Sequence, residues 1–526
     1  MDLTAADSLI IVAVLAAAAY LLAVAEVLRI PYPILLVLGG LGLSFVPGAP
    51  RIELPPDLVL VAVLPPLLYG SAFFTSLREL RANVRPIGLL AIGLVLMTTL
   101  AVAAVAHAMI PGLDWPTAFV LGAIVSPTDP TAATAIAERL GLQRRLVVLI
   151  EGESLVNDGT ALVAYRVAVA AIVTGSFSLV DATGRFVLNV AGGIAVGLAV
   201  GLVLREVRRR IDNPPVEITI SIMSGYFAYL PADAAGVSGV LAAVTVGIFM
   251  GWHTPQLTTP QMRLQGQAVW EIVFFLLNAL LFTLVGLQLP VILDRLSGFS
   301  TVTLIRYAVL IAATVVAARF VWVFATMLLP RTLRRRDPAP HLRPKIVLGW
   351  AGMRGAVSLA AALALPLTTD AGDSFPNREL IVFLTFAVIL GTLVVQGLTL
   401  PGLIRLLDLE GEELEAKEDA KARIHAAEAA LARLDELIDE DWVREETAER
   451  LRGLYGFRRS RFQARFDGED DGSIEQQSSD YQRLRRELLD AERAAVLVLR
   501  REGTISDDVM RRVVRDLDLD DARLDV

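Results

Sequence analysis

Thirteen apolar runs dominate the first 405 residues of this chain, and most of them are long enough to cross a lipid bilayer. They lie at 8–28, 31–46, 57–75, 86–110, 116–137, 146–173, 184–204, 214–230, 236–251, 267–290, 301–329, 342–367 and 379–404. A membrane-spanning helix needs roughly 20 mainly apolar residues, because lipid offers no partner to backbone N–H and C=O groups. We therefore predict an all-α polytopic membrane protein with about 13 transmembrane helices.

The last part of the chain has a different composition. Residues 1–405 carry 27 Lys/Arg and 23 Asp/Glu, a net charge of +4, whereas residues 406–526 carry 21 and 33, a net charge of −12. We predict two domains, a membrane domain over 1–405 and an acidic, helical, regulatory tail over 406–526. An apolar stripe from Ile424 to Ile438 predicts a helical hairpin or coiled coil in the tail, and 467–480 resembles a disordered link.

The loops between the apolar runs alternate in basic content. One set of loops holds 18 Lys and Arg residues, whereas the other set holds only Arg51, Arg185, Arg295 and Arg378. The basic set is expected on the cytoplasmic side. This places the N-terminus outside and, with an odd number of spans, the tail in the cytoplasm. The first run lacks a basic start and a cleavage site, so we interpret it as a retained helix of a plasma (inner) membrane protein.

Two of the apolar runs are interrupted. The fifth contains "VSPTDPTAATA", in which Pro127 and Pro130 bracket Thr128 and Asp129 and should unwind the helix near its middle. The twelfth contains "GWAGMRGAVSLA", where three glycines surround Arg354. The fifth and twelfth runs occupy matching places in two six-helix units, 1–6 and 8–13. This layout is expected of inverted-repeat transporters, whose ion site lies where interrupted helices cross.

The sixth run carries acids inside an apolar helix. A charged side chain at mid-bilayer costs roughly 2.5–3.5 kcal/mol on insertion scales, so it must face a cavity or a partner. Asp158 shares one helical face with Ser154 and Asn157. Glu153 requires a buried cation, and Arg319 and Arg354 are the candidates, whereas for Glu151 a structural role and a functional role remain equally open.

The motifs "PTDPTAA", "EGESLVNDGTAL" and "GMRGAVSLA" together resemble those of the monovalent cation:proton antiporter family 1. "LPPLLYGSAFF" is similar to its bacterial sodium/proton branch, which is related to the animal exchangers. The resemblance implies a secondary transporter that exchanges Na+, or Li+ or K+, for H+, and not an enzyme. It also implies a homodimer in the bilayer, without a cofactor or a nucleic-acid partner. Because Asn157 precedes Asp158, the resemblance implies electroneutral exchange.

The resemblance also implies residue roles. The ion- and proton-binding residues would be Asp158, Asp129, Ser154 and Thr128, the last through its carbonyl oxygen. The supporting residues would be Asn157, which orients the helix crossing, Glu153 paired with Arg319, and Arg354. The family's acid on the third helix is replaced here by Tyr69 or Gly70, which leaves the preference among Na+, Li+ and K+ open.

Competition for one carboxylate explains exchange, because Asp158 binds a cation or a proton but not both, and alternating access then carries it between faces. A potassium/proton antiporter on the same scaffold is the main alternative. An intramembrane aspartyl protease would also need two membrane aspartates, but the chain lacks a Gly-x-Gly-Asp motif. A channel with a signalling tail is a third possibility. The chain has no cysteine, which excludes disulfides and thiolate metal sites.

Overall fold

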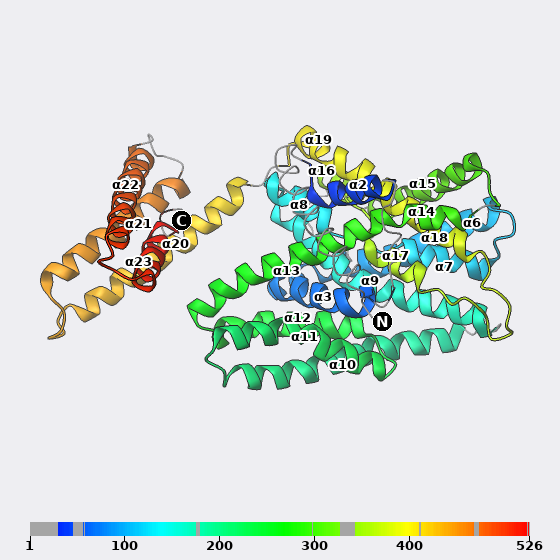
Figure 1. The fold of residues 1–526 in the computed structure, drawn as a ribbon, viewed down its shortest axis with the longest axis horizontal. Helices are drawn as coiled ribbons and strands as arrows, with labels where there is room; N and C mark the ends of the chain where they lie inside the picture. Colours follow the sequence, from blue (N-terminus) through cyan, green and yellow to red (C-terminus); the bar gives the residue numbers. More distant parts are fainter. Residues whose placement is uncertain are drawn as a thin grey trace. The chain divides into compact units, whose positions relative to one another are not determined.

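The computed structural model describes residues 30–45, 56, 58–174, 179–296, 298–326, 342–409, 412–467, 473–522 and 524. Within them the regular structure is helical, apart from one isolated β-bridge between Thr368 and Ser374. The chain divides into two compact units, Met1–Glu410 and Gly411–Val526 (Figure 1). The predicted run at 8–28 lies outside the described residues. One to three consecutive helical elements lie at each of the other predicted runs.

The helices of the first unit, in chain order, are α2 (Tyr32–Ser44), η1 (Leu58–Val63), α3 (Leu64–Phe74), α4 (Leu77–Ala82), α5 (Val84–Gly88), η2 (Leu89–Leu94), α6 (Val95–Met109), α7 (Trp115–Val125), α8 (Thr131–Arg139), α9 (Arg144–Thr174), α10 (Leu179–Arg208), α11 (Pro214–Ala234), α12 (Gly239–Leu257), α13 (Pro260–Leu287), α14 (Leu289–Asp294), α15 (Thr301–Ala325), α16 (Leu342–Trp350), α17 (Ala356–Leu363), α18 (Arg378–Gly391), η3 (Thr392–Gln396) and α19 (Gly397–Leu407). Seven helical segments among the described residues are long and apolar enough to cross a membrane. These helices confirm the prediction of an all-helical membrane protein.

Several of these helices begin with a side-chain cap. Asp114 accepts the backbone N–H of Thr117 at the start of α7, and Ser300 accepts that of Thr303 at the start of α15. Asn213, Ser238 and Thr259 do the same for α11, α12 and α13. The caps satisfy N–H groups that have no partner within the first helical turn. They therefore fix where each of these apolar segments begins.

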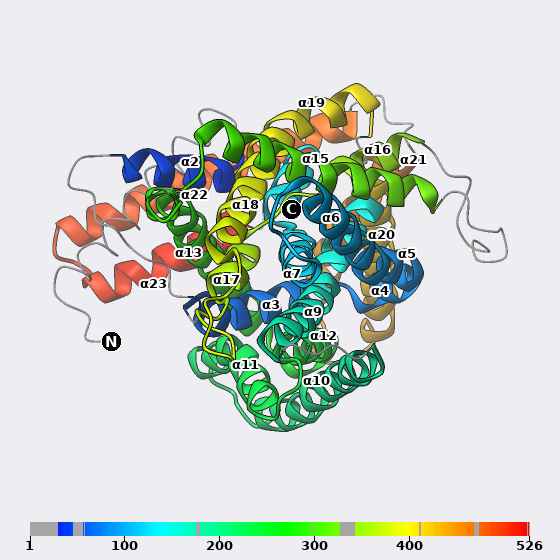
Figure 2. The same cartoon turned by 90° about the vertical axis from the view of Figure 1, so that its right-hand side faces the viewer.

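The helices of the first unit pack mainly in two groups. One group contains α2, α3 and α10–α13, and the other contains η2, α6, α7, α9 and α15–α18. Figure 2 shows α10 and α11 along one edge of the unit, with α3 and α12 next to them. The approach of α12 to α3 depends on Gly247 and Gly251, where a Cβ atom would overlap the backbone of α3.

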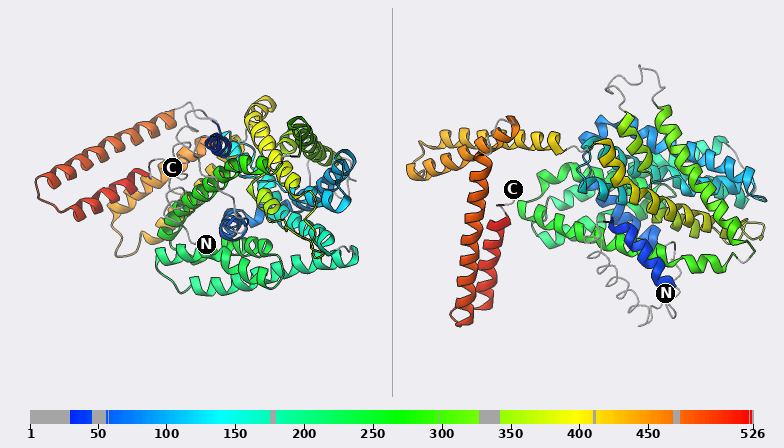
Figure 3. Two further views of the ribbon diagram at one scale, coloured as in Figure 1. Left: turned by 45° about the vertical axis from the view of Figure 1, so that its right-hand side comes forward. Right: turned by 90° about the horizontal axis from the view of Figure 1, so that it is seen from above.

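The second unit consists of two helical hairpins (Figure 3). In the first, α20 (Glu412–Leu437) packs on α21 (Glu445–Asp467) through a small core of Ala420, Ile424 and Phe462. In the second, α22 (Ser473–Arg501) and α23 (Asp507–Ala522) are joined by ion pairs of Arg493 with Asp518 and Asp521. Helix α22 begins at Ser473, so the prediction of a disordered link over all of 467–480 was wrong for 473–480. That segment is polar in composition, which does not exclude a helix, and its Ser478 is buried.

Candidate functional site

The first interruption frees the backbone around Thr128. Helix α7 ends at Val125 and α8 begins at Thr131, so the residues between them make no regular helical bonds. The Thr128 carbonyl oxygen accepts a hydrogen bond from Ser154 Oγ at 3.0 Å. Thr128 Oγ1 donates to Glu153 Oε1 at 3.0 Å and accepts from Asn157 Nδ2 at 2.8 Å. Three residues of α9 therefore hold the unwound segment in place.

The second interruption meets the first. Helix α16 ends at Trp350 and α17 begins at Ala356. The backbone N–H of Asp129 donates to the Met353 carbonyl oxygen at 2.9 Å, which joins the two unwound segments directly. Gly355 lies so close to Asp129 that a Cβ atom there would overlap its carboxylate. The Asp129 carboxylate itself accepts the backbone N–H of Thr131 at 2.9 Å, at the first residue of α8.

Glu153 and Arg319 form the buried ion pair that the sequence suggested as one of two options. Each residue is 1% exposed. Arg319 Nη1 lies 2.5 Å from Glu153 Oε1, and Nη2 lies 2.8 Å from Oε2, so the contact is bidentate. Arg319 Nε also donates to the Leu348 carbonyl oxygen at 3.0 Å. This pair ties α9 to α15 and to the end of α16.

Arg354 is also fully buried but bonds backbone carbonyls. Its Nε donates at 2.9 Å to the carbonyl of Val125, the last residue of α7, and its Nη1 donates to the carbonyl of Gly352. Its Nη2 has no hydrogen-bond partner among the described residues. A cation at the C-terminus of a helix is stabilised by the helix dipole, so Arg354 caps the broken end of α7.

Asp158 differs from Glu153 in having no bonded partner among the described residues. It is 7% exposed, and it makes neither a hydrogen bond nor an ion pair with the described residues. Asp129 is a charged residue that acts on Asp158 electrostatically. Ser154 precedes it by one turn on the same face of α9. Asp158, Ser154 Oγ, the Thr128 carbonyl and Asp129 therefore form an oxygen-rich cluster at the crossing.

The charged side chains where the two interrupted helices meet do not balance one another. Asp129, Glu153 and Asp158 contribute three negative charges when ionised, and Arg319 and Arg354 contribute two positive charges, so these five side chains sum to −1. A single monovalent cation or a single proton neutralises that sum. Glu151 lies apart from this network, because it is only partly buried and makes none of these bonds.

Tyr69 and Gly70 point away from the cluster. The Tyr69 ring is buried against Phe73 and Trp270, and Gly70 lies against Trp270. The face of α3 toward α9 is apolar, since Leu64 and Leu68 pack in one cluster with Leu155. Neither of the two residues at the position of the family's helix-three acid therefore adds a ligand oxygen.

Two polar residues in the last predicted run, 379–404, were missed by the sequence reasoning. Thr392 Oγ1, in the π-helical turn η3, accepts the backbone N–H of Arg354 at 3.2 Å. Gln396, in the same turn, is 2% exposed, and its amide has no hydrogen-bond partner among the described residues. A lone glutamine in the apolar run "GTLVVQGLTL" was the available signal.

Comparison with known proteins agrees with this geometry. The sequence profile of the family described as "Sodium/hydrogen exchanger, transmembrane" matches residues 10–406. The chain belongs to the sodium/hydrogen exchanger family. It is therefore a multi-pass membrane transporter and not an enzyme, and its activity is the antiport of a monovalent cation and protons.

Individual relatives fit this membership. An uncharacterized Na+/H+ exchanger of Mycobacterium tuberculosis is 37% identical over 94% of this chain and 92% of the relative. The sodium, potassium, lithium and rubidium/H+ antiporter of Bacillus subtilis is 36% identical over 71% of this chain and 57% of the relative. The solved sodium proton antiporter of Methanocaldococcus jannaschii has 20% identity and a TM-score of 0.61, covering 76% of this chain and 98% of that chain.

Proposed function

We propose that this transporter exchanges Na+ for H+ one for one, by competition of the two ions for the Asp158 carboxylate. The observation that carries the proposal is the contrast between two buried acids on α9: Glu153 has a bidentate arginine, and Asp158 has no basic partner among the described residues. An unpartnered buried carboxylate is stable only when a proton or a cation neutralises it.

The oxygen atoms around Asp158 suit a small hard cation. Ser154 Oγ keeps lone pairs after donating to the unwound carbonyl of Thr128, and the next residue, Asp129, adds a carboxylate. Interrupted membrane helices supply such carbonyls to Na+ in other transporters. In this proposal Asp158, Asp129, Ser154 and Thr128 bind the ion, and Asn157, Glu153, Arg319 and Arg354 support the site.

One-for-one exchange follows from the charge sum of −1 at the crossing. A bound Na+ and a bound proton each bring the buried charge to zero, so both loaded forms avoid an unbalanced charge in the low-dielectric interior. The empty site keeps one negative charge and is the form least suited to cross between faces. This difference supports obligatory, electroneutral exchange.

The remaining parts of the proposal concern the transporter in its membrane. We assign it thirteen spans with inverted six-helix repeats, an external N-terminus and a cytoplasmic tail, in the plasma membrane and as a homodimer. The loop arginines support this orientation. Potassium/proton exchange is the second candidate, because the relative from Bacillus subtilis is named for potassium as well as sodium.

The test is a cation panel in proteoliposomes with a pH-sensitive dye. We expect exchange with Na+ and none in Asp158→Asn, which keeps the size of the side chain but cannot ionise. Asp158→Glu should retain weak exchange. Asp233→Asn is the matched control, because Asp233 is an exposed partner of Arg166 and lies outside the cluster.

Three results would contradict the proposal in whole or in part. Full exchange by folded Asp158→Asn would remove Asp158 as the carrier. Exchange driven by a potassium–valinomycin potential would show that the stoichiometry is not one for one. Exchange with K+ and none with Na+ would favour the second candidate on the same site.

A further inference from the structure

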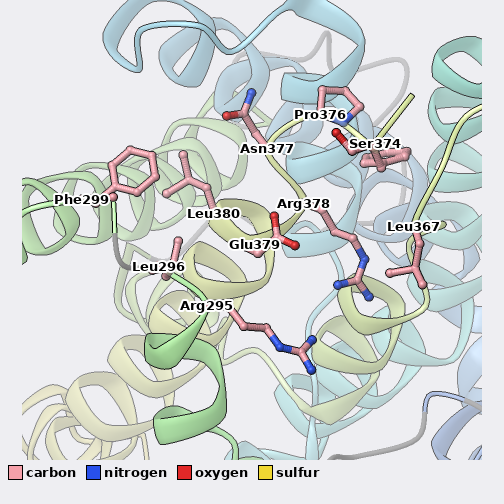
Figure 4. Close-up of a pocket in the computed structure, with 12 residues that line it drawn as sticks. Arg295, Leu296, Phe299, Leu367, Ser374, Pro376, Asn377, Arg378, Glu379 and Leu380 are labelled. Carbon is pink, nitrogen blue, oxygen red and sulfur yellow. The ribbon is translucent and has the colours of Figure 1, made fainter. Parts of the chain in front are cut away.

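Three membrane-spanning segments have their ends at one place on the predicted outer side. They are Pro260–Asp294, Thr301–Ala325 and Arg378–Leu407. A cavity of about 330 Å³ lies between these ends, and its charged lining residues are Arg295, Arg378 and Glu379 (Figure 4). Because span ends lie at the membrane–water interface, this cavity lies at the depth of lipid headgroups.

The positive charge of this cavity is unusual for its side of the protein. The predicted outer loops contain only four arginines, and two of them, Arg295 and Arg378, line this one cavity. Figure 4 shows the side chains of Arg295, Arg378 and Glu379 among the residues that line this cavity. The three side chains sum to +1, with a negative group next to two positive ones.

Two side chains in the wall of the cavity are fixed by hydrogen bonds to backbone carbonyls. Arg378 is buried and donates from Nε to the Leu365 carbonyl at 3.0 Å and from Nη2 to the Leu363 carbonyl at 2.8 Å. Asn377 adopts a left-handed conformation with φ of 52°, and its Nδ2 donates to the Gly112 carbonyl at 3.1 Å. A left-handed non-glycine residue persists only where its surroundings fix it. The side chains of Arg295 and Glu379 are exposed.

An apolar groove lies on the same helices, deeper in the membrane. It has a volume of about 420 Å³ and is lined by Leu289 of α14, by Ile305 and Val309 of α15, and by Phe383, Phe386 and Leu390 of α18. A smaller cavity shares Arg295, Arg378 and Glu379 with the first and also reaches Val382 of α18. The charged cavity and the apolar groove are therefore neighbours on one surface of the protein.

One face of α18 connects them. Glu379, Phe383, Phe386 and Leu390 follow one another at spacings of four, three and four residues, so they form a single stripe along the helix. Eleven residues of helix rise by about 16 Å. That distance is about half of a hydrocarbon core of about 30 Å, which is the depth of one leaflet.

We propose that this surface binds one phospholipid of the outer leaflet, with the headgroup in the charged cavity and an acyl chain in the groove. The headgroup it fits carries a phosphodiester and a primary ammonium group, as in phosphatidylethanolamine. Arg295 is the arginine assigned to the phosphate oxygens, because Arg378 already donates from Nε and Nη2 to backbone carbonyls. Arg378 adds its positive charge, and Glu379 attracts the ammonium group. Glu379 also disfavours an anionic headgroup, which offers it no positive charge.

The bound lipid would contact both helix groups of the membrane unit. Leu38 of α2, which also lines the groove, belongs to the group of α2, α3 and α10–α13, whereas α15 and α18 belong to the other group. Short helix α14 follows α13 and leads into α15. The lipid therefore lies along the connection between the two groups, independently of which cation is carried.

Native mass spectrometry of the full-length protein tests the headgroup. The protein is offered phosphatidylethanolamine, phosphatidylglycerol and phosphatidylcholine with identical acyl chains. We expect phosphatidylethanolamine to be retained at least about tenfold better than the other two, a difference equivalent to about 1.4 kcal/mol. Arg295→Gln should abolish the preference, and Glu379→Gln should selectively raise the retention of phosphatidylglycerol. Arg185→Gln is the control, because Arg185 is an exposed outer arginine on α10 away from the cavity.

A second measurement tests the acyl chain. The chain contains no cysteine, so Val309→Cys gives one site for a fluorophore in the groove. Nitroxide on the acyl chain of phosphatidylethanolamine should quench this label more strongly than a label at Leu188→Cys, an exposed position near the outer part of α10. Equal retention of all three lipids, or a preference that survives Arg295→Gln, would overturn the proposal. So would equal quenching at the two positions, or binding of soluble phosphoethanolamine as tight as that of the lipid.

Discussion

At the residue scale, the partner of a buried acid decides what the acid can do. Glu153 and Asp158 lie on the same helix, five residues apart, and both are buried. Arg319 compensates the charge of Glu153 through a bidentate contact that joins α9 to α15. Asp158 lacks such a group among the described residues, and in the proposed function the transported ions neutralise its charge.

Replacing Arg319 should therefore destabilise the protein. Arg319→Ala leaves Glu153 buried without its cation, which costs roughly 3–5 kcal/mol, and Glu153→Gln in the same protein should restore part of that loss. The melting temperature of the purified transporter measures both effects. Arg166→Ala removes an exposed ion pair with Asp233 and should cost roughly 0–1 kcal/mol. If Arg319→Ala melts like Arg166→Ala, the buried pair does not stabilise the fold.

At the element scale, two helices are useful because they are broken. The break in α7–α8 exposes the carbonyl of Thr128, and the break in α16–α17 brings Met353 and Gly355 against Asp129. Arg354 caps the end of α7 that this break leaves without helical partners. Unwound backbone is tolerated at membrane depth only where protein or a water-filled cavity satisfies its polar groups. Here the two unwound segments bond each other, through the Asp129 N–H and the Met353 carbonyl.

The close approach of the two breaks predicts a strong effect of one methyl group. Gly355→Ala places a Cβ atom against the Asp129 carboxylate and should force the crossing apart. We expect loss of most exchange, with a destabilisation of roughly 1–3 kcal/mol from overpacking. Gly391→Ala is the matched control, because a Cβ atom at Gly391 meets open space. Normal exchange by Gly355→Ala in the proteoliposome assay would show that the crossing tolerates separation.

At the scale of the whole molecule, exchange should depend on pH through competition. Lowering the pH fills Asp158 with protons, so the apparent affinity for Na+ should weaken by up to about tenfold per pH unit once the protonated form dominates. The rate should then pass through a maximum, limited by cation binding on the acid side and by proton supply on the alkaline side. Apparent affinities for Na+ measured at several pH values check this. An affinity independent of pH across the range would exclude a shared site.

The tail should be separable from transport. Its helices form a compact unit of their own from Gly411, and the oxygen cluster lies wholly in Met1–Glu410. A protein ending near Glu410 should keep Na+/H+ exchange, with a changed rate or pH response if the tail is regulatory. Loss of all exchange in a truncated protein with an unchanged melting temperature would contradict that role.

Much of the fold could be predicted from local patterns. Apolar length located the helices, because a span in lipid has to bond its own backbone, and Pro127 and Pro130 located the first break for the same reason. The π-helical turns could not be foreseen, because they depend on how helices pack against their neighbours. The bond from the Arg354 backbone N–H to Thr392 Oγ1 could not be foreseen either, because it depends on the same helix packing.

The sequence by itself determined which residues would be expensive to bury, and hence that Asp129, Glu153, Asp158, Arg319 and Arg354 had to meet partners or ions. It did not determine which acid would meet which base, because Arg319 and Arg354 were both available to Glu153. Only the tertiary structure decided this, by bringing Arg319 within 2.8 Å of Glu153 and directing Arg354 to the end of α7. Pairing over 166 residues depends on the packing of helices that no local pattern encodes.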